Sequence, residues 1–206
     1  MKQKITCFCD NTFEVEIPEE INLDSDPKHI EEILNGSFLT FPCEVCGKEH
    51  KPEFPLTIKW PAKNTDIEVL GELDRGKFYL RKDSKENAAA ETVISYPEMA
   101  ERIAIIKEGL VTEAVEALKY YLFVKADETY PDNEISVWYH SKTEDNLEFH
   151  IHGIKENEVA MMKVPLSLYE KTLSDFKKNP NTEPFSSMRV KSYFSMQNML
   201  RPDVLK

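Results

Sequence analysis

The stretch FPCEVCGKEH, residues 41–50, separates Cys43 from Cys46 by two residues and places a glycine directly after Cys46. A tight turn of this kind lets two thiolates point at one centre, and glycine accepts the positive φ that such turns often require. The stretch ITCFCDN, residues 5–11, supplies the other two cysteines of the chain, Cys7 and Cys9. Thiols grouped in close pairs are typical of zinc sites. We therefore predict that Cys7, Cys9, Cys43 and Cys46 bind one structural Zn²⁺.

The segment between the two cysteine pairs predicts a short helix enclosed by strands. Asp26 is a suitable N-cap, Pro27 suits the first helical turn, and Asn35-Gly36 is a stop signal. Residues 12–17 alternate apolar and polar side chains as a strand does, and residues 37–41 are the expected partner strand. The layout predicts a zinc ribbon with a helical insert in its hairpin.

The segment after the second cysteine pair carries weaker signals. Residues 51–70 contain three prolines, which favours edge strand and loop over central sheet. Residues 77–81 are expected to form a short strand, and the polar tract 82–95 is expected to be a linker. We therefore predict a zinc-ribbon-like domain at 1–70 and a second, α+β region at 71–206.

The second region has clearer periodicity. Ser95 and Glu98 fit a capping box, and Gly109 separates two apolar stripes of helical period, which together predict an αα-hairpin at about 96–126. Three strand-like segments over about 135–164 predict an antiparallel meander, followed by a helix at about 166–178. The expected fold class is α+β.

Composition limits the class of function. The net charge is −11, and residues 1–70 hold 7 lysines against 14 acidic residues. Nucleic-acid binding needs cations that displace counterions from phosphates, so nucleic acid is an unfavourable partner. No apolar run reaches the length of a membrane span, and the amino terminus lacks the pattern of an export signal. We expect a cytoplasmic protein with no membrane contact, in a compartment where thiols stay reduced.

The chain resembles the CpXC family of bacterial proteins, which has little assigned function, over about residues 1–125. The resemblance rests on the early cysteine pair and on three stretches: IPEEINLDSDP (17–27), ILNGSFLTFPCEVCG (33–47) and IAIIKEGLVTEAVEALK (103–119). The chain departs from the family pattern at Glu44, where a proline is usual, and in the single residue between Cys7 and Cys9. The resemblance implies a zinc-ribbon fold and no known reaction.

Alternatives to four-thiolate zinc remain open from the sequence. His50 could replace Cys7 or Cys9 as a ligand. Cys43 and Cys46 could form a redox pair, although Gly47 favours a turn over the helix start that such pairs occupy. Two disulfides, or a catalytic zinc, are the other possibilities. An all-cysteine site leaves no open position for water, so we predict no catalysis at the metal and no catalytic residues.

The histidines of the second region carry the alternative hypothesis of an enzyme. His150 and His152 lie two apart on a predicted strand, so their side chains share a face, and Glu148 shares it with them. His140 is expected near Leu147 and facing away from His150. The simpler interpretation is a solvated polar face. If this region is an enzyme, its reaction is unknown and its site lies near His150 and His152.

The favoured prediction is a non-enzymatic module that contacts another protein or a second copy of itself. The tail 186–200 carries methionines and aromatic residues, which are enriched at protein contacts, although burial of this tail in the protein's own core is the more favoured interpretation. The sequence indicates no further cofactor.

Overall fold

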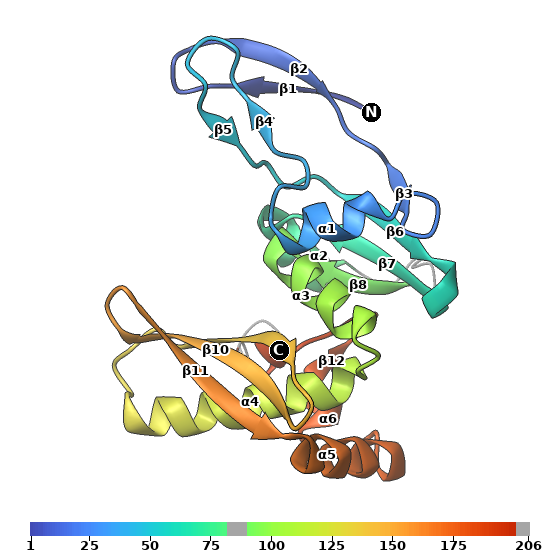
Figure 1. Ribbon diagram of the computed structural model, residues 1–206, viewed down its shortest axis with the longest axis vertical. Helices are drawn as coiled ribbons and strands as arrows, with labels where there is room; N and C mark the ends of the chain where they lie inside the picture. Colours follow the sequence, from blue (N-terminus) through green and yellow to red (C-terminus); the bar gives the residue numbers. More distant parts are fainter. Residues whose placement is uncertain (82–89, 201–206) are drawn as a thin grey trace. The chain divides into compact units, whose positions relative to one another are not determined.

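The computed structural model describes residues 1–81 and 90–200, and it contains both helices and strands, as the α+β prediction requires (Figure 1). The chain forms two compact units, Met1–Ala100 (unit 1) and Glu101–Lys206 (unit 2). The boundary between the units thus follows residue 100, whereas the sequence predicts a domain boundary at residue 70. The compact unit continues beyond it because β8, Glu91–Ile94, pairs in parallel with β7, Thr65–Leu70. Whether 1–70 forms a domain of its own stays a prediction.

Two small hairpins carry the cysteines. The first joins β1 (Lys2–Thr6) to β2 (Thr12–Glu16), and the second joins β4 (Phe41–Pro42) to β5 (Glu49–His50). The predicted strand at 12–17 is therefore confirmed, but its predicted partner at 37–41 is wrong. Residues 37–40 form a turn in which Leu39 has a φ of 51°, and β1 takes the partner's place.

A mixed sheet forms the rest of unit 1. Its strands lie in the order β3 (Glu20–Asn22), β6 (Leu56–Trp60), β7, β8, with β6 and β7 antiparallel and the outer pairs parallel. The prediction of edge strand and loop over 51–70 is wrong, because the prolines fall just outside the strands. Pro55 precedes β6 and Pro61 follows it, so every N–H within the strand remains available for pairing.

Helices α1, α2 and α3 lie around this sheet (Figure 1); their bounds are Lys28–Leu34, Arg75–Leu80 and Tyr96–Lys107. Helix α1 ends at Asn35-Gly36 as expected, but it begins after Pro27, and Asp26 does not cap it. The strand expected at 77–81 is wrong. That segment is helical instead. At its start, buried Arg75 forms ion pairs from its Nη2 to the carboxylates of Glu72, at 2.7 Å, and Glu98, at 2.8 Å, and these stabilise the helix.

The linker expected at 82–95 lies partly outside the described residues. Its described end is strand β8 instead, and Val93 and Ile94 of that strand are fully buried. Half of the predicted capping box is present, because the N–H of Ser95 donates to Leu70 O and the Glu98 carboxylate accepts from the N–H of Ile94 instead, at 3.4 Å. The backbone N–H of Glu98 donates to Ser95 Oγ at 3.4 Å, and α3 begins at the next residue, Tyr96. After Gly109, with a φ of 70°, α4 runs over Thr112–Thr129.

Unit 2 contains the predicted antiparallel meander and its helix. The strands β9, β10 and β11 pair in the order β11-β10-β9, and α5 follows them; the bounds are Ser136–Lys142, Asn146–Lys155, Glu158–Pro165 and Leu166–Lys178. One face of the sheet packs on α4 and α5 in a core centred on Val115, Leu118, Leu147 and Phe149. The opposite face carries the histidines.

The tail contains three short elements, α6, β12 and β13, at Phe185–Met188, Arg189–Val190 and Tyr193–Phe194. Short 3₁₀ turns occur at Pro61–Lys63, Glu72–Asp74 and Met196–Asn198. Met188, Phe194 and Met196 are buried against α4 in a second core cluster of unit 2. Burial of the tail in the protein's own core is therefore confirmed for these side chains, and they offer no free surface to a partner.

Candidate metal centre

The two hairpins bring all four cysteines together. Cys7 and Cys9 lie in the turn between β1 and β2, and Cys43 and Cys46 lie in the turn between β4 and β5. A backbone hydrogen bond closes each turn: the N–H of Asp10 donates to Cys7 O, three residues earlier, at 3.0 Å, and the N–H of Gly47 donates to Cys43 O, four residues earlier, at 2.8 Å. Asp10 follows the second cysteine of its pair as Gly47 does, and aspartate, like glycine, is common in turns.

The four sulfur atoms form one compact group, all lying within 4.8 Å of one another. Cys7 Sγ lies 3.5 Å from Cys46 Sγ, and Cys9 Sγ lies 3.7 Å from Cys43 Sγ, so the close contacts run between the two hairpins. Cys7 and Cys43 are buried, whereas Cys9 and Cys46 are exposed, and all four are free thiols. The group could hold a metal ion.

Hydrogen bonds to sulfur favour the thiolate form at one position. The N–H of Cys46, the side-chain amide of Asn11 and the N–H of Val45 outweigh burial and lower the pKa of the Cys43 thiol to about 6. Asn11 Nδ2 lies 3.5 Å from Cys43 Sγ. Because the donor belongs to the first hairpin, Asn11 connects the two turns. In the sequence, the position of Asn11 directly after the first cysteine pair and Asp10 is the only signal for this role.

At Cys7, burial and the neighbouring sulfurs favour the protonated thiol instead of the thiolate. The N–H of Cys9 lowers the pKa of the Cys7 thiol, but burial and the sulfurs of Cys46, Cys9 and Cys43 outweigh it and raise that pKa to about 12. Four adjacent thiols cannot all lose their protons unless a cation balances the charge. The arrangement therefore has the donor set and the charge imbalance of a metal site.

His50 lies outside the sulfur group. It is on β5 opposite Phe41, and its ring packs against Phe8 and Phe13 with centroid distances of 6.2 and 6.0 Å. Among the described residues its buried Nε2 has no hydrogen-bond partner. The structure thus places His50 beside the hairpins as an aromatic neighbour, and the four cysteines come together without it.

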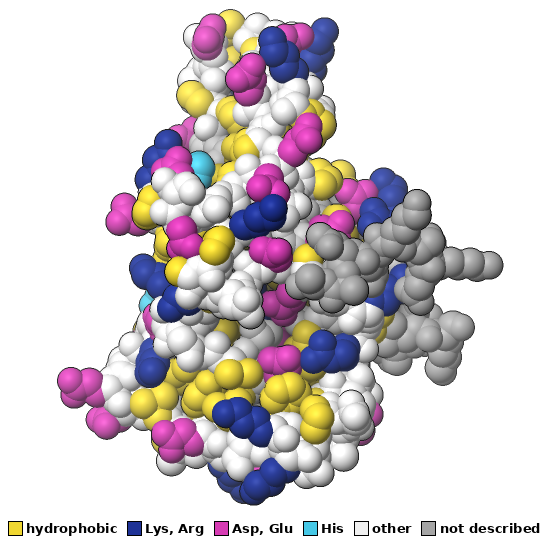
Figure 2. Space-filling view, turned by 90° about the vertical axis from the view of Figure 1, so that its right-hand side faces the viewer, with side chains coloured by type: hydrophobic (Ala, Val, Ile, Leu, Met, Phe, Trp, Pro, Cys, Tyr) yellow, Lys and Arg dark blue, Asp and Glu magenta, His cyan; other side chains and the backbone are white. Residues whose placement is uncertain are grey.

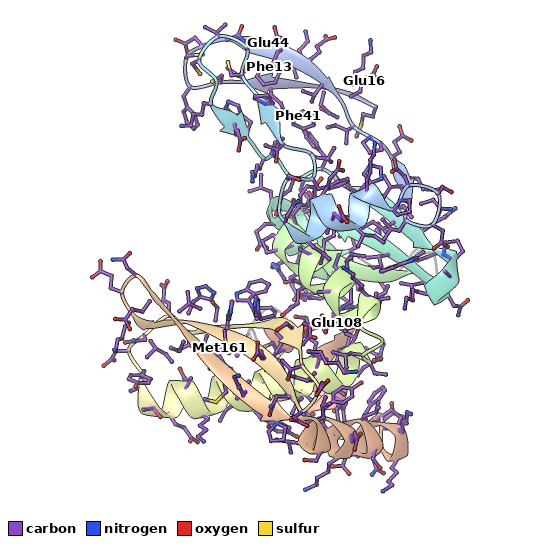
Figure 3. The ribbon with its side chains drawn as sticks, in the orientation of Figure 1. Phe13, Glu16, Phe41, Glu44, Glu108 and Met161 are labelled. Carbon is purple, nitrogen blue, oxygen red and sulfur yellow. The ribbon has the colours of Figure 1, made fainter. Side chains whose placement is uncertain are left out.

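The outer ends of the turns are apolar and exposed. Phe8 and Val45 are 84% and 70% exposed, although each lies between two clustered cysteines. Lys48 Nζ lies 4.0 Å from the centroid of the Phe8 ring, which adds a cation–π contact to this surface. Glu44, which takes the usual proline position, lies at the end of the second hairpin (Figure 3).

The histidines of unit 2 do not lie as expected. The register of β9 against β10 shifts between Glu148 and Phe149, and this bulge turns His140 toward His150. Their rings stack with a centroid distance of 3.9 Å, so the expectation that His140 faces away from His150 is wrong. His152 lies next to His150 with a centroid distance of 6.4 Å. His140 and His152 are exposed to solvent, on the sheet face away from the core.

A buried ionic group connects the helices of unit 2. Lys119 Nζ donates to Glu101 at 2.6 Å and to Glu116 at 2.8 Å, and all three side chains are at most 5% exposed. Glu101 also accepts from the N–H of Tyr139 at 2.5 Å, and Glu116 from that of Met196 at 2.8 Å. Every member has protein partners, so the group holds α4, β9 and the tail together. Sequence reasoning missed it, because these residues fit the pattern of ordinary amphipathic helices.

Within residues 1–81 and 90–200, no helix is both long enough and apolar enough to cross a membrane.

Comparison with known proteins matches the region that contains the cysteine group. Residues 5–119 match the family described as CpXC protein. An uncharacterized protein of Treponema pallidum (strain Nichols) is 27% identical over 215 residues, which cover 95% of this chain and 97% of that relative. No solved structure matches the chain. Because the matched region includes all four cysteines and more than half of the chain, the chain belongs to the CpXC family.

Proposed function

We propose that Cys7, Cys9, Cys43 and Cys46 bind one structural Zn²⁺ in a zinc-ribbon fold. The spacing of the sulfurs carries the proposal. Tetrahedral zinc with Zn–S bonds of about 2.3 Å separates its sulfurs by about 3.8 Å. The contacts between the hairpins, 3.5 and 3.7 Å, are close to that separation.

The ion is structural rather than catalytic. Catalytic zinc retains a position for water, whereas four thiolates complete the tetrahedron. The hairpins also need the ion. Their apolar cluster contains only Ile5, Val15 and Ile17 as buried members, and metal ligation can contribute on the order of 10 kcal/mol to folding such small units. A reducing compartment such as the cytoplasm keeps the thiols available.

The biological role that this architecture favours is a contact with another protein. The zinc holds the two turns, and the turns present Phe8 and Val45 to solvent on a fixed support. Exposed aromatic side chains on a rigid support are typical of contact residues. The tail 186–200 is a weaker candidate for this contact because its large apolar side chains are buried.

Metal content and chelation test the zinc site. Elemental analysis of the full chain is expected to give one Zn²⁺ per molecule, and Cys43→Ser is expected to abolish binding. Removal of the ion with a chelator is expected to move the NMR signals of Phe13 and Val15 toward random-coil positions. Leu147 and Phe149, in the core of unit 2, are expected to keep their shifts. Metal-free protein with unchanged hairpin signals would overturn the proposal.

The alternative of an enzyme near His150 and His152 has one specific observation in its favour. The bulge in β9 places His140 on His150, and burial together with the neighbouring histidines His140 and His152 lowers the pKa of His150. His140 and His152 are exposed, however, and solvent around these side chains favours a polar surface over an active site. Loss of an activity in His150→Asn, with folding retained, would be required to revive this alternative.

A further inference from the structure

A pocket of about 410 Å³ lies in unit 1, between α1, the segment 51–53 and the start of α3. Its floor is apolar, and its volume lies in the range of small-molecule sites. Ile33, Phe38 and Met99 line it, and at 2%, 5% and 2% exposure their side chains are fixed by the core beneath. The floor is thus preformed.

Two aromatic rings form one wall of the pocket. The rings of Phe38 and Tyr96 pack in a tilted arrangement, with a centroid distance of 6.1 Å and an angle of 45° between their planes. The Tyr96 hydroxyl donates to the carbonyl of Phe54 at 3.2 Å and accepts from its N–H at 3.1 Å, which fixes the ring. Burial raises the pKa of Tyr96 to about 12, so this hydroxyl stays neutral. The wall is therefore aromatic and fixed in position, and it suits an apolar group.

The mouth of the pocket carries the ammonium group of Lys51. Its Nζ donates to the carbonyl of Gly36 at 2.8 Å, which leaves two of its three donor positions for other groups. Across the described parts of the chain, Lys51 forms no ion pair. Glu53, also at the mouth, accepts from the N–H of Tyr96 at 2.7 Å and from that of Glu72 at 2.6 Å. The hydrogen-bond donors that remain free at the mouth are therefore those of the Lys51 ammonium.

We propose that this pocket binds a small apolar carboxylic acid. The branched or aromatic body lies on Ile33, Phe38 and Met99, and the carboxylate accepts hydrogen bonds from Lys51. A neutral amide of the same shape retains the apolar contacts and loses the charge-assisted bond.

NMR of the full, zinc-loaded chain with labelled methionine methyl groups tests this directly. Titration with 3-phenylpropionate is expected to shift the Met99 signal and to leave that of Met188, buried in unit 2, unchanged. The matched amide, 3-phenylpropanamide, is expected to bind about tenfold more weakly, as loss of one charge-assisted hydrogen bond predicts. Equal affinity for acid and amide, or an unmoved Met99 signal, overturns the proposal.

Two variants locate the contacts. Lys51→Gln is expected to weaken binding of the acid about tenfold and to leave binding of the amide unchanged. Lys4→Gln is the matched control, since Lys4 is an exposed lysine of the same unit outside the pocket lining, and it is expected to bind as the parent does. If Lys51→Gln retains the preference for the acid, the assignment of Lys51 is wrong and the proposal falls with it.

Discussion

Asp10 and Gly47 perform the same conformational task in the two cysteine turns, with φ values of 64° and 72°. Aspartate adopts this left-handed conformation more readily than most residues, because its short polar side chain can bond locally. The turn of the first hairpin therefore closes around a C-x-C spacing, although it has one residue fewer between its cysteines. The missing residue between Cys7 and Cys9 therefore changes the form of the turn, but the sulfurs of Cys7 and Cys9 still lie within 4.8 Å of those of Cys43 and Cys46.

Asn11 is predicted to tune the metal site from outside the ligand set. Asn11→Ala removes the donor to Cys43 Sγ, and loss of such an outer hydrogen bond typically lowers metal affinity by about 10- to 100-fold. Competition with a chromophoric chelator measures this affinity. The stoichiometry is expected to stay the same, and Asn181→Ala, on an exposed turn of unit 2, is the control. An unchanged affinity would show that the contact is incidental.

Gly153 is predicted to be the least replaceable glycine of unit 2. A Cβ at this position would lie 2.0 Å from the carbonyl oxygen of Glu134, and φ is 89°. Gly153→Ala must therefore displace backbone, and we expect a loss of about 3 kcal/mol or more in the free energy of unfolding. Urea denaturation measures the loss.

Gly109 provides the matched control for that experiment. Its φ is also positive, at 70°, but a Cβ added to Gly109 would meet no atom within 4 Å. Gly109→Ala is expected to cost only about 1 kcal/mol, the conformational penalty alone. Equal losses in the two variants would contradict the steric argument for Gly153.

At the scale of elements, periodic segments were predictable and segments fixed by distant partners were not. Helix α5 and the meander follow their own apolar periods, so their predictions are confirmed. The partner of β2 could not be predicted, because β1 is short and pairs with β2 only if the turn that contains Cys7 and Cys9 forms. The α2 helix depends on Glu98, which is 23 residues from Arg75 in sequence. The bulge at His140 likewise leaves no trace in an alternating pattern.

The same limit applies to the candidate site. The four cysteines were identifiable because their spacing alone indicates metal binding, and the structure brings their sulfurs together. Asn11 was not identifiable, because an asparagine after a turn has many ordinary roles. The pocket beside α3 also escapes sequence reasoning, since its lining comes from three separate segments.

The buried ionic group of α3 and α4 predicts a pH dependence of stability. Burial raises the pKa of Glu101 to about 7, although Lys119 acts to lower it. In the unfolded chain this carboxyl has its ordinary pKa, so between about pH 4.5 and about pH 7 the unfolded state releases a proton that the folded state retains. The contribution of Glu101 to stability is therefore full below this window and is lost as the pH rises through it.

Urea midpoints of unit 2 across that window measure the effect. Glu101→Gln cannot titrate, and we expect the stability of the parent relative to this variant to fall steadily as the pH rises. The lowered pKa of His150 acts in the opposite direction, since its contribution is lost as the pH falls. Because His150 titrates in both proteins, comparing them isolates Glu101. A difference that does not depend on pH would contradict the raised pKa.

At the scale of the whole molecule, charge predicts weak attraction to nucleic acid. The chain carries a net charge of −11, and acidic and basic side chains are interspersed over the face shown in Figure 2. Fluorescence anisotropy with labelled DNA or RNA at low salt is expected to show no saturable binding, because the surface repels phosphates. Salt-sensitive binding would contradict this and would point to a local basic patch.

The order of the cysteines along the chain sets when a metal can act during synthesis. All four lie in unit 1, ahead of unit 2 in the chain, so the ligand set is complete before unit 2 has been made. At about 5–20 residues per second, synthesis of unit 2 alone takes roughly five to twenty seconds. An ion captured in that interval cross-links Cys9 to Cys43 and removes chain entropy much as a disulfide does, by about 4 kcal/mol for a loop of this length. Metal supply would then decide whether the nascent amino-terminal hairpins are locked before unit 2 leaves the ribosome.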